Sequence, residues 1–309
     1  MKKYLWGIFY GLLLTAFTVY VLMDTFVITR VYTTVPSDND NESSVIIGDA
    51  EDDDDSVQSQ PDGSSVVLTE NSYSDGNISI TITEYRENDT TIYVADVQLS
   101  SAQYLQTAFA KGAYGKNVTE KTSKIAEDNN AILSINGDYY GTREKGYVLR
   151  NGVLYRSTAD SDQEDLVIYK DGSFEIVTEK KVSASDLAEK GAQQILSFGP
   201  ALVIEGEIAV TEDEEVGKAK SSNPRTAIGI IDELHYVFVV SDGRTSASEG
   251  LSLHELAEFM QSLDVDIAYN LDGGGSSTMA FNGKVINNPT TNGKSIKERS
   301  VSDIVYIGY

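Results

Sequence analysis

Apolar and polar residues alternate along much of the chain, which is the pattern of half-buried β-strands. Ile78, Ile80 and Ile82 are separated by polar residues, and residues 92–97 repeat the pattern less strictly. Further apolar runs predict strands at residues 131–135, 195–198, 201–204, 226–231, 236–240, 266–271 and 304–307. Most of the chain is therefore expected to build β-sheet.

Two dipeptides predict tight hairpins between strands. Asn151-Gly152 lies between the apolar runs 147–149 and 153–155, and Asp171-Gly172 lies between residues 166–169 and 174–177. Such dipeptides favour the turns that match the twist of paired strands. Adjacent antiparallel strands follow from both.

Helical patterns are few. They occur at residues 119–129, 183–190 and 252–263, and Ser252 with Glu255 fits a capping box at the start of the last of these. Many strands with a few helices predict an α+β fold, a single strand-rich domain with mixed or antiparallel sheets.

The N-terminus predicts a membrane anchor. Residues 5–23 carry no charge and are long enough to cross a bilayer as a helix. Lys2 and Lys3 precede this run and indicate a cytoplasmic N-terminus. A cleaved signal peptide is the alternative, but no small-x-small site follows Met23, and the run exceeds the usual apolar length of about 7–15 residues. We expect a cytoplasmic stub at 1–4, a transmembrane signal-anchor helix at 5–23 and an extracellular remainder, in a single-pass protein of the cell membrane.

An acidic segment follows. Residues 31–70 are rich in Asp and Glu and contain no Lys or Arg. Low hydrophobicity with charge of one sign favours disorder. We predict a disordered linker at 24–72, a stalk that holds the domain at 73–309 clear of the membrane surface.

Composition excludes several classes of function. The net charge is −24 and no basic patch of the nucleic-acid-binding kind is present, so nucleic acid is not an expected partner. Cysteine is absent, which excludes disulfides, thiol nucleophiles and cysteine metal sites. His235 and His254 are the two histidines, too few for a polyhistidine zinc site.

Three apolar strands end in an aspartate close to a glycine. Asp138, Asp242 and Asp272 follow residues 131–135, 236–240 and 266–271, respectively. One Asp-Gly pair is usually a turn, but three at strand ends favour a shared site. After Asp272 come Gly273, Gly274 and Gly275, whose N–H groups could form an anion-binding nest, and then the hydroxyls of Ser276 and Ser277.

Two arginines could complement these carboxylates. Arg225 precedes the strand 226–231, and Arg244 follows Asp242-Gly243. The planar guanidinium suits phosphate or carboxylate. Surface ion pairs are the alternative for both in so acidic a chain.

The polar segments together resemble the phosphodiester glycosidase family. The resemblance rests on NLDGGGSSTM at 270–279, INGDYY at 135–140, SFGP at 197–200, RTAIG at 225–229 and DGR at 242–244, and it covers about residues 95–309. It implies hydrolysis of a sugar-1-phosphodiester, of the N-acetylglucosamine-1-phosphodiester type, to free sugar and phosphomonoester.

On this hypothesis the acid/base or nucleophile is among Asp138, Asp242 and Asp272, with individual roles open. Asn136 would orient the sugar, and the two arginines with residues 273–277 would bind the phosphate. The substrate is expected in cell-envelope or exopolysaccharide metabolism, with an envelope polymer as one carrier of it, and no cofactor is expected. Two alternatives stay open: a metal-dependent phosphodiesterase, with a divalent cation on the three aspartates, and a non-catalytic envelope-polymer binder.

Overall fold

The computed structural model describes residues 2–35, 66–211 and 222–309. Its largest sheet is antiparallel and has nine strands. Their order is β16 (Glu207–Ile208), β15 (Ala201–Ile204), β19 (Ile267–Asn270), β17 (Arg225–Asp232), β18 (His235–Ser241), β5 (Thr90–Leu99), β4 (Ile78–Glu87), β3 (Ser72–Ser74) and β2 (Val67–Leu68).

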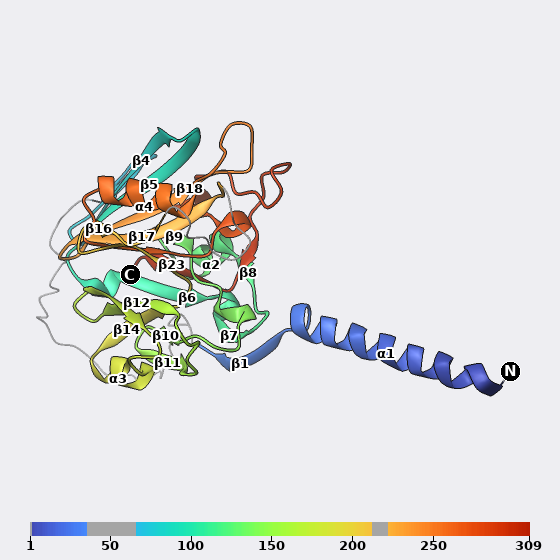
Figure 1. The fold of residues 1–309 in the computed structure, drawn as a ribbon. Helices are drawn as coiled ribbons and strands as arrows, with labels where there is room; N and C mark the ends of the chain where they lie inside the picture. Colours follow the sequence, from blue (N-terminus) through green and yellow to red (C-terminus); the bar gives the residue numbers. More distant parts are fainter. Residues whose placement is uncertain (1, 36–65, 212–221) are drawn as a thin grey trace, which may run out of the picture.

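Two five-stranded antiparallel sheets complete the body of the domain. One has the order β21 (Lys284–Val285), β20 (Met279–Phe281), β9 (Leu133–Asn136), β23 (Asp303–Ile307) and β6 (Leu105–Phe109). The other, directly below the first in Figure 1, has the order β11 (Val153–Arg156), β10 (Val148–Arg150), β14 (Ala192–Leu196), β12 (Glu164–Tyr169) and β13 (Phe174–Thr178).

Short elements connect these sheets. β1 (Arg30–Thr34) pairs with β7 (Ala113–Lys116), and β22 (Ser300–Val301) pairs with β8 (Glu120–Lys121). The α-helices are α1 (Lys2–Phe26), α2 (Thr122–Asp128), α3 (Ala184–Glu189) and α4 (Leu253–Ser262). Single 3-10 turns are η2 (Ala102–Tyr104), η3 (Ala110–Gly112), η4 (Tyr140–Thr142) and η5 (Gly274–Ser276).

The main core lies between the sheets. Side chains from the nine-stranded sheet, such as Phe238 and Tyr269, share one buried cluster with Ile135 of β9 and Val305 of β23. Because strand side chains alternate between two faces, the other face of the nine-stranded sheet needs its own cover. The apolar side of α4 supplies it. The predicted α+β fold is confirmed.

The predicted cap of α4 is present. The Ser252 hydroxyl accepts from the N–H of Glu255 at 3.1 Å, and the Glu255 carboxylate accepts from the N–H of Ser252 at 2.7 Å. Both bonds satisfy amides that the first helical turn leaves without partners. The capping box thereby fixes where the chain leaves residue 251 and enters the helix.

Helix α1 projects from the domain as an isolated rod (Figure 1). Its segment Trp6–Phe26 is long and apolar enough to cross a membrane, and none of it is buried against the domain. The helix continues three residues beyond the predicted end at Met23. Length and composition therefore fit an anchor or a signal sequence.

The ends of the predicted linker 24–72 differ from the prediction. Residues 36–65 lie outside the described residues, but residues 30–34 form β1 on the edge of β7, and residues 67–68 form β2 beside β3. The chain thus enters the domain directly after α1 instead of first forming a stalk. The difference concerns the ends of the linker, because the pairing of Arg30–Thr34 depends on β7, a strand far along the chain that no local pattern indicates.

Candidate active site

Asn136 joins the ends of two strands that carry predicted aspartates. Its side-chain amide donates to the carbonyl of Asp272 at 2.6 Å, and its oxygen accepts from the Thr226 hydroxyl at 2.8 Å and the Thr278 N–H at 3.2 Å. The side chain is fully buried. Its geometry suits a brace between β9 and the segment after β19, which differs from the predicted contact with a sugar.

Asp272 has the environment of a reactive carboxylate. Its Oδ2 accepts from the Ser276 hydroxyl at 2.5 Å and from Arg299 Nη2 at 2.8 Å. Burial raises its pKa, while Arg299 and the Ser276 hydroxyl act in the opposite direction. The residue is buried, with 13% of its side chain exposed.

Arg299 was not found from the sequence. Its Nε donates to the Ser276 hydroxyl at 2.9 Å, so the guanidinium binds both the serine and the carboxylate of Asp272. It lies just before β22, in a segment without an apolar period or a glycine pattern that could have drawn attention to it. A carboxylate 27 positions earlier in the chain pairs with it only because the fold brings the two together.

The glycines after Asp272 admit neighbouring side chains. A Cβ built on Gly274 would lie 2.8 Å from Arg244 Nη2, and one on Gly275 would lie 2.4 Å from the Thr291 hydroxyl oxygen. Gly274 also has a φ of +63°, which a side chain would strain. Glycine is therefore needed here for close approach.

Part of the predicted anion nest and of the turn that follows it is already hydrogen-bonded within the protein. The N–H of Gly274 donates to Pro224 O at 2.7 Å, and those of Ser276 and Ser277 donate to the carbonyls of Gly273 and Gly274, each at 3.3 Å. Backbone amides already bonded in this way are poor donors to a phosphate. Arginine side chains add positive charge near this turn.

Arg244 supplies part of that charge. Its Nε and Nη2 donate to the Asn223 side-chain oxygen at 3.0 and 2.9 Å, and its Nη1 donates to Thr291 O at 2.7 Å. Burial and the nearby Arg299 guanidinium both lower its pKa. Two arginines that repel each other across a glycine turn form a natural place for an anion.

Arg225 lies deeper. It is 3% exposed, its Nε donates to Leu251 O at 2.8 Å, and its Cδ is 3.9 Å from a Cβ built on Gly273. The guanidinium is thus packed under the glycine turn. It adds positive charge to the site from below, whereas Arg244 and Arg299 lie closer to the surface.

Asp138 is held by three donors. Its Oδ1 accepts from the Tyr140 N–H at 2.9 Å, and its Oδ2 accepts from the Ser197 N–H at 2.9 Å and Arg150 Nη2 at 2.8 Å. The residue is 2% exposed. Such a carboxylate is well placed to exert a fixed negative field, and it has little capacity left for a substrate.

Asp303 shares Arg150 with Asp138. Its Oδ2 accepts from Arg150 Nε at 3.0 Å and Nη2 at 2.7 Å, and a Cβ built on Gly137 would lie 2.4 Å from its Oδ1. Burial, then repulsion from Asp138, raises the pKa of Asp303 to about 8. Neither Arg150 nor Asp303 was predicted. The one available signal was a charged residue at the start of the apolar strand 304–307.

Asp242 binds a different segment. Its oxygens accept from the backbone N–H and the side-chain amide of Asn288, at 2.7 and 2.8 Å, and from the Asn287 amide at 3.4 Å. Asn287 in turn donates to Ser277 O at 3.0 Å. Asp242 therefore supports the site indirectly. Within residues 2–35, 66–211 and 222–309, no group of three or more His, Cys, Asp or Glu residues is arranged to hold a metal ion.

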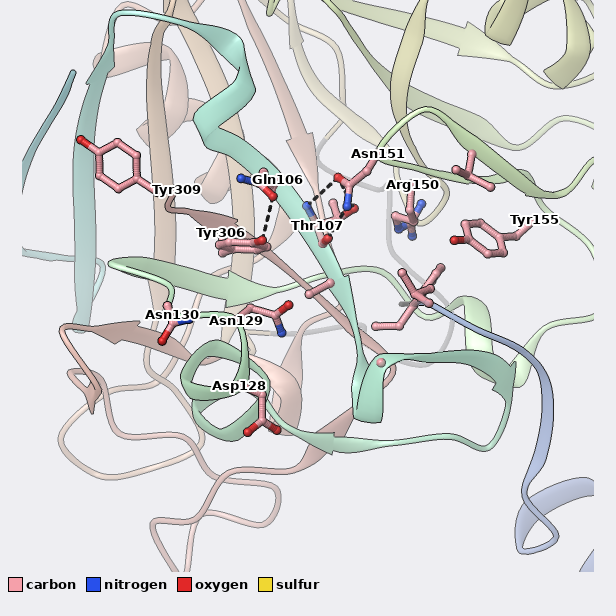
Figure 2. A pocket seen from close by; sticks show the side chains of 15 residues that line it. Gln106, Thr107, Asp128, Asn129, Asn130, Arg150, Asn151, Tyr155, Tyr306 and Tyr309 are labelled. Atoms are coloured by element: carbon pink, nitrogen blue, oxygen red, sulfur yellow. Dashed lines mark hydrogen bonds between the residues drawn. The ribbon is translucent and has the colours of Figure 1, made fainter. Parts of the chain in front are cut away.

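A separate cavity of about 290 Å³ lies against β6 and the β10–β11 hairpin (Figure 2). Some of its polar side chains bond to other residues of the lining: Tyr306 donates to Gln106 at 2.8 Å, and Asn151 donates to Thr107 O at 2.8 Å. Arg150 touches the cavity, but its donors are directed to the buried aspartates and to backbone carbonyls. The Asp272 group is the better candidate for chemistry.

Comparison with known proteins decides the family. A family model described as phosphodiester glycosidase matches residues 129–308, which is more than half of the chain and includes each aspartate discussed above. The chain belongs to the phosphodiester glycosidase family. The resemblance stated from the motifs is confirmed.

Relatives of this family member differ in how well they are characterised. The SPbeta prophage-derived uncharacterized protein YomE of Bacillus subtilis is 29% identical over 203 residues, covering 63% of this chain and 31% of that protein. The N-acetylglucosamine-1-phosphodiester alpha-N-acetylglucosaminidase of Mus musculus is 30% identical over 159 residues, covering 47% of this chain and 30% of the mouse protein. The chain thus spans about a third of the length of these curated relatives.

A solved structure supports the fold of this family member. The catalytic domain of zebrafish N-acetylglucosamine-1-phosphodiester alpha-N-acetylglucosaminidase, auto-inhibited by its pro-peptide, aligns with a TM-score of 0.60 at 21% identity. The alignment covers 75% of this chain and 83% of that one. At this identity the likeness concerns the architecture.

Proposed function

We propose that this protein is a glycosidase that hydrolyses a sugar-1-phosphodiester, of the N-acetylglucosamine-1-phosphodiester type, to free sugar and a phosphomonoester. The observation that carries the proposal is the group formed by Asp272, Ser276 and Arg299, with Arg244 across the glycine turn. It sets a buried carboxylate in contact with the Arg299 guanidinium, with a second guanidinium, that of Arg244, close to Arg299. Cleavage of the bond between an anomeric carbon and a phosphate is assisted by a carboxylate together with positive charge next to the phosphate.

The reaction follows from the positions of these groups. Arg244 and Arg299 bind the phosphate and neutralise the charge that grows on it as the bond from the anomeric carbon to the phosphate oxygen breaks. The electron pair leaves with that oxygen, and water attacks the anomeric carbon. Asp272 Oδ1, which accepts no hydrogen bond from the described residues, takes the proton of that water. Asp138 stabilises the positive charge of the oxocarbenium-like state through its fixed field.

The other predicted site residues act in support on this proposal. Asn136 braces the strand ends, Asp242 fixes residues 287–288, and Arg225 adds charge beneath the turn. Ser276 orients the carboxylate of Asp272. Ser277 is fully buried and its hydroxyl has no hydrogen-bond partner among the described residues, so it is a poor candidate for direct contact with substrate.

We also propose that α1 anchors the protein in the cell membrane with the N-terminus in the cytoplasm and the glycosidase domain outside. The apolar length of Trp6–Phe26 and the lysines that precede it support this topology. A substrate in cell-envelope or exopolysaccharide metabolism would be within reach of a domain so placed.

The test uses the full chain in detergent. It is incubated with UDP-N-acetylglucosamine and with simple α-N-acetylglucosamine-1-phosphodiesters, with and without EDTA, and the products are separated. Release of free sugar that is insensitive to EDTA and lost in Asp272→Ala is the expected result. Release of sugar-1-phosphate, or activity that a divalent cation must restore, would instead make the protein a metal-dependent phosphodiesterase.

A further inference from the structure

The segment after α1 is built into the domain. β1 pairs antiparallel with β7, with Arg30 opposite Lys116, Val31 opposite Gly115 and Thr34 opposite Ala113. Only residues 27–29 separate the end of α1 from the start of β1. A connection this short, followed at once by a paired strand, leaves the domain little freedom to move away from the helix.

Asn117 fixes the exit of the helix. Its side-chain amide donates to Ile28 O at 3.0 Å and Thr25 O at 3.2 Å, and its own carbonyl accepts from the Thr29 hydroxyl at 3.4 Å. The last carbonyls of a helix have no partner within it, so a side chain that binds them caps the helix. Here that cap comes from the domain.

Gly115 shows that β7 is shaped for this contact. A Cβ built on it would lie 2.1 Å from Arg30 O, a distance that no side chain tolerates. Beside it, the ring of Tyr32 contacts that of Tyr114, with centroids 5.8 Å apart. The docking of β1 thus depends on the absence of a side chain at Gly115 and on the contact between Tyr32 and Tyr114, in addition to strand pairing.

The same joint touches the loop that carries Asp138. The N–H of Asn117 donates to Gly141 O at 3.0 Å, and the ring of Tyr114 stacks on that of Tyr140 with centroids 5.4 Å apart. The N–H of Tyr140 is one of the three donors to Asp138. Asn117 therefore contacts both the end of α1 and the loop 138–141 that carries Asp138.

These contacts place the site close to the membrane. Residues 138–141 can span at most about 10 Å, and each hydrogen bond through Asn117 adds about 3 Å. The Asp138 loop thus lies within roughly 20 Å of the last turn of α1, so a helix that spans the hydrocarbon core keeps this loop near the polar region where the core ends. A stalk that held the site clear of the surface, as predicted from the sequence, does not fit this geometry.

We propose that β1 is a docking strand that holds the site at the bilayer surface, and that the substrates are lipid-linked sugar-1-phosphodiesters, whose phosphate lies at the level of the headgroups. This inference rests on the glycosidase activity and the membrane anchorage proposed above. It adds a substrate class and a reason for the pairing of β1 with β7. A polymer far from the membrane would be poorly served by a domain held in this way.

The experiment compares two substrates in proteoliposomes that contain the full chain. Both carry the same α-N-acetylglucosamine-1-phosphodiester; one ends in a long isoprenoid chain within the same vesicles, and the other in a short water-soluble alcohol. The docking strand is disrupted by Val31→Pro with Thr33→Pro, because proline removes the N–H groups that pair strands. The matched control is Val31→Thr with Thr33→Val, which keeps two β-branched residues at the same positions.

For the wild-type chain and the control we expect a preference for the lipid-linked substrate of at least tenfold in kcat/KM. In the proline variant that preference should fall by at least fivefold while the soluble substrate is still hydrolysed. Any enzyme anchored in a vesicle is concentrated near the lipid-linked substrate, so a preference for that substrate alone does not test the docking strand. The test is whether the proline variant, which α1 still anchors, loses this preference. A preference unchanged by proline, or none in the wild type, would overturn the inference.

A second measurement tests docking without activity. The chain contains no cysteine, so Arg30→Cys with Lys116→Cys introduces one pair at opposed positions of β1 and β7. Oxidation should link the two, as shown by mass spectrometry of the peptides, and the linked protein should keep its lipid preference. The pair Arg30→Cys with Lys121→Cys should stay unlinked, and equal linking of both pairs would contradict a docked β1.

The two underlying proposals fail separately. Extraction of the wild-type chain from vesicles by alkaline carbonate would overturn the anchorage. Absence of sugar release from both substrates would overturn the glycosidase activity. Equal use of both substrates by an anchored, active enzyme overturns the docking proposal alone.

Discussion

In the candidate site, charged side chains a few ångströms apart shift one another's pKa values. Asp272 is buried enough for its pKa to rise, yet Arg299 and Ser276 hold one of its oxygens and counter that rise. Arg299 also lowers the pKa of Arg244. An anionic phosphate between the two guanidinium groups would relieve their repulsion, so substrate binding and charge balance favour each other.

The side chain of Asp272 can be tested by an isosteric change. Asp272→Asn keeps the size of the group and removes the base, so we expect kcat to fall by about 10²–10⁴-fold. Asp171→Asn is the matched control, because Asp171 also precedes a glycine but lies in the hairpin between β12 and β13. Steady-state kinetics on a sugar-1-phosphodiester checks both, and an Asp272→Asn enzyme with wild-type turnover would remove the residue from the mechanism.

Arg299 should set the pH dependence of the reaction. Because it lowers the pKa of Asp272, Arg299→Gln should raise that pKa. A base must be ionised to work, so the acidic limb of the kcat/KM profile should move to higher pH in the variant. The profile is measured over about pH 4–9. A limb that stays in place while activity falls would show that Arg299 acts only on the phosphate.

Asp303 should make stability depend on pH. Its pKa of about 8 in the folded chain lies above the ordinary 3.8, so between these values the folded chain holds a proton that the unfolded chain has lost. The stability contributed by this group is complete below pH 3.8 and is lost as the pH rises through 8. Asp303→Asn carries no charge to bury, so its free energy of unfolding should decline less between these pH values.

Urea unfolding of the full chain in detergent, at about pH 5 and about pH 8.5, checks this expectation. The free energy of unfolding of the variant should rise relative to that of the wild type as the pH rises. Arg150 keeps Asp138 as its partner in both proteins, so the loss of the Asp303 carboxylate does not leave this arginine unpaired. Parallel decline of the two proteins would mean that Asp303 is ionised throughout, paired with Arg150.

At the level of elements, the turn that contains Gly275 is expected to be intolerant of any side chain. Gly275→Ala would place a Cβ 2.4 Å from the Thr291 hydroxyl oxygen and displace the turn that carries Asp272 and Ser276. A displacement of about 1 Å can cost about 10²-fold in rate. Gly283→Ala is the control, since a Cβ there meets nothing within 4 Å although its φ of +74° is strained.

Both glycine variants are compared by kcat/KM and by thermal unfolding. We expect Gly275→Ala to lose activity and Gly283→Ala to lose only stability, by about 1 kcal/mol. Equal activity in the two would show that the segment near Thr291 yields without moving the turn.

Most elements were predictable because they follow local rules. The hairpins at Asn151-Gly152 and Asp171-Gly172 form as β10–β11 and β12–β13, and the capping box at Ser252 starts α4. Turn chemistry and capping act over a few residues, so sequence alone carries them. The ends of strands were also predictable, so the sequence correctly placed Asp138 after β9 and Asp272 after β19.

The missed residues depend on distant parts of the chain. Arg299 pairs with a carboxylate 27 positions away, and Arg150 with Asp303 at a separation of 153. No local pattern marks a residue whose partner is brought to it by sheet pairing. β1 was missed for the same reason, because its partner β7 begins some eighty positions later.

For the whole molecule, the net charge of −24 opposes the binding of an anionic substrate of the kind proposed above. The arginines around Asp272 act over a few ångströms in a poorly solvated place, whereas the excess negative charge belongs to the chain as a whole, and much of it lies in residues 31–70. Salt weakens the interaction of exposed charges beyond a Debye length of about 10 Å at 0.1 M, and it weakens buried pairs much less. Added salt should therefore remove the repulsion before it weakens the attraction.

We accordingly expect kcat/KM for a sugar-1-phosphodiester that carries several negative charges to rise severalfold between about 10 and 150 mM salt. The kcat/KM for a singly charged diester of the same sugar should change little. For both substrates kcat should stay constant, because the association of enzyme and substrate does not limit the rate at saturation. Initial rates at several ionic strengths test this directly. A fall in kcat/KM with salt would mean that Arg244 and Arg299 dominate the field well outside the site, and that the acidic charge lies too far from the path of the substrate to matter.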